Sequence, residues 1–100
     1  MNFPAYYQSL CNYLHKINIA IDCEGFSNKR VSKAIQTYIQ VESLVSGYSM
    51  EEARAAGIIA AAPIKLGKIS QEESLALLNE YRARFNDKKI TDFFNKEPNI

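Results

Sequence analysis

Apolar residues recur every three to four positions over most of the chain, which is the spacing of an amphipathic helix. The first such segment begins near Phe3 and ends between Lys16 and Ile21. Residues 17–21 alternate isoleucine with polar or small residues, a pattern that a strand also shows. Because the chain offers no evident partner strand, we expect the helix to continue or fray there. The apolar stripe consists of Tyr6, Leu10, Leu14 or Tyr13, Ile17 and Ile21.

The second segment, from Ser27 to about Ser46, shows the clearest amphipathic pattern in the chain. Phe26, just before the segment, and Val31, in its first turn, are placed to form a hydrophobic staple. The opposite face is polar. The apolar face consists of Val31, Ala34, Ile35, Tyr38, Val41 or Glu42, and Val45.

The third and fourth segments begin with a capping signal. Ser49 is followed three residues later by Glu52, and Ser70 by Glu73, as in a capping box. We expect the third helix to end near Ala62, because a proline at position 63 disfavours the helical conformation of the residue before it. The fourth helix extends to about Phe85, and its stripe consists of Leu75, Leu78, Tyr81 or Arg82, and Phe85.

A glycine precedes each of the three capping serines, as Gly25, Gly47 and Gly67. Glycine adopts the left-handed conformation past a helix end without strain, so each glycine predicts the end of a helix. The similar spacing of these signals is also compatible with a repeat array. The segments share no side-chain pattern beyond the caps, so we expect helices of similar length around one core.

These patterns predict an all-α fold in a single domain, residues 1–96. We expect a compact, roughly antiparallel bundle of four main helices. A short helical turn over residues 90–95 follows, with Phe93 and Phe94 docking back on the bundle. Residues 97–100 are predicted to be a flexible tail.

Composition narrows the functional classes. Of the 100 residues, 47% are hydrophobic and 23% charged, as in ordinary globular proteins. The formal net charge of +1 provides no general attraction to nucleic acid or anionic membranes. The N-terminus lacks the basic flank and apolar run of a secretory signal, and the longest apolar run, residues 55–64, is too short to cross a bilayer. We therefore expect a soluble cytoplasmic protein.

The strongest candidate for chemistry is the pair Cys11 and His15, which one helical turn separates. Neither a second ligand pair of zinc-site spacing nor a residue to orient the histidine accompanies them. The other thiol, Cys23, would lie about 18 Å further along a helix, which excludes a disulfide. The paired carboxylates that open the third and fourth helices are explained by capping. We predict two free cysteines, no metal, no cofactor and no enzymatic activity.

The most unusual stretch is Ala55–Ala62, which contains no polar side chain. A helix that is apolar all round is usually buried, so this helix could be the central one. Alternatively, one side packs internally and the other meets a partner. Tyrosines on the first helix also exceed what one core stripe can bury, and tyrosine is favoured in contact surfaces. The candidate partner-binding residues are Tyr6, Tyr7, Tyr13, Ala56, Ile59 and Ala60.

The absence of a catalytic motif and the surplus of apolar surface predict a small protein-binding factor. It would be an adaptor, inhibitor, immunity-type or regulatory protein that binds another protein or a second copy of itself.

The alternative is a nucleic-acid-binding regulator. Gly47-Tyr48-Ser49 resembles the turn of a helix-turn-helix, but the following helix begins with Glu51 and Glu52, which phosphates would repel. A better basic patch opens the second helix, with Lys29, Arg30 and Lys33.

Overall fold

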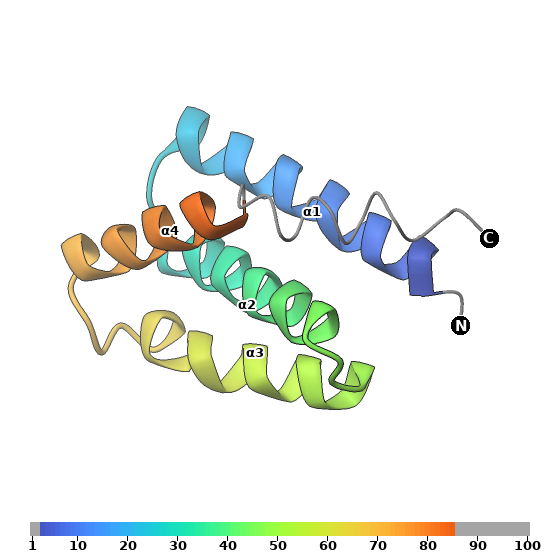
Figure 1. The fold of residues 1–100 in the computed structure, drawn as a ribbon. Helices are drawn as coiled ribbons and strands as arrows, with labels where there is room; N and C mark the ends of the chain where they lie inside the picture. Colours follow the sequence, from blue (N-terminus) through green and yellow to red (C-terminus); the bar gives the residue numbers. More distant parts are fainter. Residues whose placement is uncertain (1–2, 86–100) are drawn as a thin grey trace.

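The computed structural model describes residues 3–85, which form four α-helices without any strand. The helices pack as a bundle, so the predicted all-α fold is confirmed (Figure 1). The predicted C-terminal turn with Phe93 and Phe94, and the tail at 97–100, lie outside the described residues. The helices are α1 (Phe3–Glu24), α2 (Asn28–Val45), α3 (Met50–Lys65) and α4 (Gln71–Phe85).

The junctions between the helices have the predicted chemistry. Gly25, Gly47 and Gly67 have φ values of +95°, +97° and +70°, the left-handed conformation that ends a helix. Ser49 caps α3 in a capping box: Ser49 Oγ accepts from Glu52 N–H at 3.1 Å, and Glu52 Oε1 accepts from Ser49 N–H at 2.9 Å. Serines also cap the other two junctions: Ser27 Oγ accepts from Arg30 N–H, and Ser70 pairs reciprocally with Glu73.

The end of α1 decides between two alternatives, and the end of α3 differs from the prediction. The helical alternative for residues 17–21 is confirmed, because α1 continues to Glu24. The predicted end of the third helix at Ala62 is wrong: Pro63 lies inside α3, which continues to Lys65. Lacking an N–H, Pro63 removes one helical hydrogen bond. The extra turn buries Ile64, which is 1% exposed, and Lys68 N–H donates to Pro63 O at 2.8 Å to close the end.

The centre of the bundle is α2, which packs against each of the other three helices. Figure 1 shows α1 and α3 on opposite sides of α2. Val31, Ala34 and Val41 on α2 are completely buried. The alternative in which Ala55–Ala62 forms the central helix is therefore wrong. The wide apolar face of α2 is covered from several sides, whereas α3 buries only one of its faces.

The phase of the α1 stripe also differs from the expectation. Tyr7 is 1% exposed and lies in the core with Leu14, Ile17 and Ile21. Tyr6 is only half-buried, and its hydroxyl accepts a hydrogen bond from the Gln40 side-chain amide. Positions 7, 14 and 21 return to the same side of a helix, so the larger tyrosine contact with the core falls one residue later than predicted.

Small residues allow α3 to lie very close to α2. Ala53 and Ala61 are buried in the contact, and Gly57 lies between them along the helix. A Cβ atom at position 57 would lie 2.5 Å from the backbone oxygen of Gln36. Only glycine fits there, so the α2–α3 contact is a packing of backbone against backbone.

Candidate functional site

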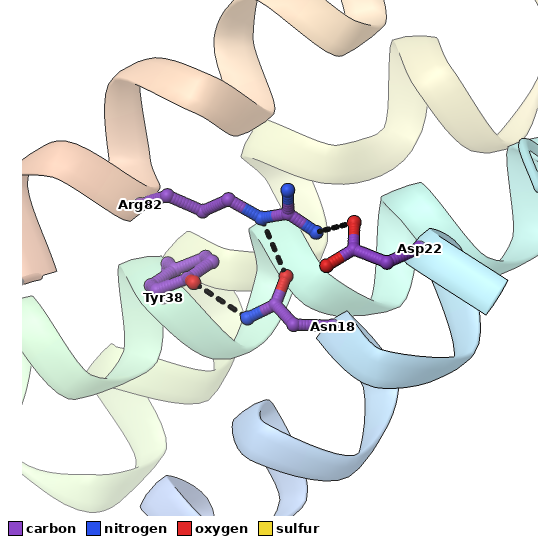
Figure 2. A network of polar contacts seen from close by, with 4 residues as sticks. All are labelled: Asn18, Asp22, Tyr38 and Arg82. Atoms are coloured by element: carbon purple, nitrogen blue, oxygen red, sulfur yellow. Dashed lines mark hydrogen bonds and ion pairs between the residues drawn. The ribbon is translucent and has the colours of Figure 1, made fainter.

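The densest group of polar side chains joins α1, α2 and α4. Asn18 donates from Nδ2 to the Tyr38 hydroxyl at 2.7 Å and accepts at Oδ1 from Arg82 Nε at 2.8 Å. Arg82 Nη2 also contacts Asp22 Oδ1 at 3.1 Å (Figure 2). Asn18 thus uses both ends of its amide, and the guanidinium meets a carboxylate and an amide oxygen. The group ties three helices together.

The Tyr38 ring in this group lies among other aromatic rings. It stacks on Tyr81 with ring centroids 6.2 Å apart and meets the edge of Phe85 at 5.3 Å. Burial raises the pKa of Tyr38, so the hydroxyl remains protonated at neutral pH. Its hydrogen-bonding role toward Asn18 is that of an acceptor, which suits packing more than proton transfer.

Beside this group lies a cavity of about 320 Å³ that Cys11 and His15 also line. One helical turn separates these two residues, as the sequence predicts, and they share a wall of the cavity. Burial raises the pKa of the Cys11 thiol to about 11. A nucleophilic cysteine requires a lowered pKa, so this thiol lacks the activation that catalysis needs. In the part of the chain described, 3–85, no three His, Cys, Asp or Glu side chains gather closely enough to hold a metal ion.

Among the large apolar side chains of residues 3–85, the two most exposed, Ile59 and Leu66, lie on α3 and directly after it. Ile58 is 52% exposed, Ile59 73% and Leu66, the residue after the helix, 66%. Ala55 is exposed and Ala62 half-buried beside them. We call these five residues the α3 face. Soluble proteins rarely leave large apolar residues together on one helix face unless a partner covers them.

Charged side chains flank the α3 face at its two ends. Glu51 and Glu52 lie in the first turn of α3, and Lys65 lies in the last. The N–H of Ser49 holds the pKa of Glu52 below its usual value. Arginines elsewhere are paired within the fold, with Arg30 on Glu24 and Arg84 on Glu42.

In contrast, neither Glu51, Lys65 nor the following Lys68 forms an ion pair with any other residue in the range 3–85.

The structure separates the predicted partner-binding residues into two groups. Ile59 and Ala60 are exposed on α3, with Ala56 half-buried beside them. Tyr13 is 39% exposed on α1, where it lines a pocket with Lys33 and Gln36 of α2. Tyr6 is half-buried against Gln40, and Tyr7 lies in the core, where no partner can reach it. Tyr7 therefore does not belong to a surface with the α3 residues.

Ile58 and Leu66 are exposed on the α3 face but were not among the residues predicted to bind a partner. The spacing of Ala55, Ile59, Ala62 and Leu66, alternately four and three residues, was the available signal. It places all four on one side of a helix, but an all-apolar stretch contains several such stripes.

The basic residues of the alternative hypothesis lie at the opening of α2. Lys29 and Lys33 are exposed, whereas Arg30 is paired with Glu24. The antiparallel course of α2 and α3 brings Gly67 beside Asn28: a Cβ at Gly67 would lie 3.4 Å from Asn28 Nδ2. This neighbourhood places Lys68 at the same end of the molecule as Lys29.

Comparison with known protein families, with curated proteins and with solved structures finds no match for this chain. Within residues 3–85, none of the helices combines the length and the apolar character that crossing a bilayer requires.

Proposed function

We propose that this protein acts by binding a second protein molecule, either another protein or a second copy of itself, and that the α3 face is its contact surface. The observation that carries this proposal is the exposure of Ile58, Ile59 and Leu66 together along one helix. Fully burying an aliphatic side chain of this size contributes about 1.5–3 kcal/mol, so covering these three residues is a substantial driving force for association. The close backbone contact between α2 and α3 behind them holds the helix in place, and a surface held in its bound shape loses less entropy on binding.

The proposal is consistent with a role as an adaptor, inhibitor or other regulatory protein. A helix face with large apolar side chains in the middle and charges at its ends suits docking against a groove or another helix. The polar groups of Figure 2 are engaged with one another, and the neighbouring thiol is protonated. These features favour a binding protein over a catalyst.

Site-specific photo-crosslinking tests the contact surface. A benzophenone amino acid replaces Ile59 in one variant and Ala83, an exposed residue on α4, in the control. In the native cells we expect an adduct from position 59 and none from position 83. The attached protein is then purified, and its affinity for the chain is measured. We expect Ile59→Glu to weaken that affinity at least tenfold, whereas an equal affinity of the variant would contradict the proposal.

A nucleic-acid-binding regulator is the second candidate. The observation in its favour is the neighbourhood of Lys29 and Lys68, with Lys33 one turn further along α2. Binding to phosphates weakens steeply as salt concentration rises. A gel-shift series in increasing salt tests this candidate: a salt-sensitive complex that Lys29→Glu and Lys33→Glu abolish would support it, and the absence of any complex at low salt would contradict it.

A further inference from the structure

We infer that the partner of the α3 face is a second copy of this chain, bound with the two α3 helices antiparallel around a two-fold axis. This inference rests on the proposed function and names the partner. Two properties of the face lead to it: the order of large and small side chains, and the order of charges.

The first property is an alternation of size. The stripe Ala55, Ile59, Ala62 and Leu66 reads small, large, small, large along the helix. When two such stripes lie antiparallel, Ile59 of each copy can face Ala62 of the other, and Leu66 can face Ala55. Large residues then lie opposite small ones at each level, which is the arrangement that fills space between helices. The stripe is therefore complementary to itself.

The second property is the charge at each end. Glu51 and Glu52 lie in the first turn of α3, Lys65 is its last residue, and Lys68 follows three residues after it. In an antiparallel pair the acidic end of each helix lies at the basic end of its partner. A two-fold axis makes this contact twice, because the same residues meet on both sides. A parallel pair would place like charges together, which is unfavourable.

Several charged side chains elsewhere in the bundle form ion pairs within the fold. Arg30, Arg82 and Arg84 each have a carboxylate partner inside the fold. Glu51, Lys65 and Lys68 have none among residues 3–85, although they flank the most exposed apolar face. Other charges among residues 3–85, such as Arg54 of α3, also lack an ion pair, but Glu51 and Lys65 are the ones that an antiparallel second copy would bring together.

The face is short, because a helix of 16 residues is about 24 Å long. Such a contact is smaller than the standard interface of about 20–30 residues on each side. We therefore expect a weak dimer that forms in the micromolar to millimolar range, and salt should weaken the charged part of the contact.

A charge-exchange experiment tests the dimer. One variant carries Glu51→Lys, and the other carries both Lys65→Glu and Lys68→Glu. Glu52 is retained because it closes the capping box of α3. Each variant alone places like charges at both ends of the contact, and we expect its self-association to be about tenfold weaker than that of the wild type. In a mixture, each end of the heterodimer again pairs opposite charges, so we expect affinity to recover.

Self-association is measured by sedimentation equilibrium at low ionic strength. For the mixture, a fluorophore on the exposed Cys23 thiol of α1 follows one variant while the other is titrated. Ile59→Glu serves as the apolar control and should be monomeric. Circular dichroism confirms that each variant keeps its helices. A wild type that is monomeric at the highest soluble concentration, charge variants that associate like the wild type, or a mixture without recovery would each overturn the dimer.

The crosslinking experiment at Ile59 separates this inference from the proposed function. An adduct between two copies supports both. An adduct with a different protein, or within a single chain, overturns the dimer, and the different protein leaves the proposed function in place. If position 59 forms no more adduct with any protein than the control position 83, both fail.

Discussion

The two faces of α3 use apolar residues in opposite ways. Over its first three turns the inner face is built from small residues, Ala53, Gly57 and Ala61, which bring the backbone of α3 against that of α2. The outer face carries Ile58 and Ile59, which are largely exposed. A larger side chain at position 57 would push the helices apart, and the one large residue of the inner face, Ile64, lies in the last turn beyond this close contact. Hydrophobicity alone therefore does not identify the core side of this helix, and the glycine at the point of closest backbone approach marks it better.

The largest effect should come from adding bulk to the inner face. Gly57→Val places a Cβ 2.5 Å from the backbone oxygen of Gln36, and a backbone atom cannot move aside like a flexible side chain. We expect the free energy of unfolding to fall by about 3 kcal/mol or more, measured by urea denaturation. The matched control is Ala55→Val on the outer face, where we expect a loss of at most about 0.7 kcal/mol from helix propensity. Equal losses in the two variants would contradict the close backbone contact.

Removing bulk should give the next largest effect, again on one face only. Ile64 is 1% exposed, and Ile64→Ala should lower the free energy of unfolding by about 2–4 kcal/mol through lost burial and the cavity left behind. Ile59 is 73% exposed, so Ile59→Ala should change it by no more than about 0.5 kcal/mol. Both are measured at a concentration where the chain is monomeric. A large loss for Ile59→Ala would show that another part of the chain covers this residue.

Local sequence signals predicted the helices and their junctions because these depend on nearby residues. Each glycine of the pattern has a positive φ, and the capping boxes at Ser49 and Ser70 form between residues three apart. The end of α3 was predicted wrongly for the opposite reason. Proline acts locally against the helix, but the burial of Ile64 against distant residues extends it through the last turn.

The candidate site was only partly predictable for the same reason. Between Ala55 and Ala62 the chain has no polar residue to mark the outer side, so the sequence left the helix open as central or peripheral. The choice depends on α2, which occupies the centre. Ile59 was predicted to bind a partner and lies on the exposed face of α3. Tyr7 was predicted to bind a partner as well, but it is buried. The phase of the α1 stripe, which the adjacent tyrosines leave ambiguous, turns Tyr7 inward.

The buried Tyr7 also couples folding to alkaline pH. Burial raises the pKa of Tyr7 to about 12, above its ordinary value of 10. Below pH 10 both folded and unfolded chains keep the phenol proton, so its contribution to stability is complete. Between pH 10 and 12 the unfolded chain ionises first, and the free energy of unfolding falls, by about 1 kcal/mol at pH 11. We expect Tyr7→Phe to reduce the slope of this loss in urea titrations from pH 9 to 11. An unchanged slope would show that Tyr7 does not couple folding to pH.

The smallest effect should come from the acidic end of the α3 face. The Ser49 N–H lowers the pKa of Glu52. Because the pKa of Glu52 is lower in the folded chain, its charge contributes to the stability of the fold. This contribution is complete above the unfolded pKa, near 4.5, and is lost as the pH falls through the folded pKa. Glu52→Gln keeps an acceptor for the cap but cannot titrate. Between roughly pH 6 and pH 3, the range in which Glu52 titrates, we therefore expect the melting temperature of this variant to fall less than that of the wild type. Equal falls in melting temperature would show that the cap does not depend on the charge of Glu52. The electrostatic difference between the two ends of α3 would then rest on Glu51 and the lysines alone.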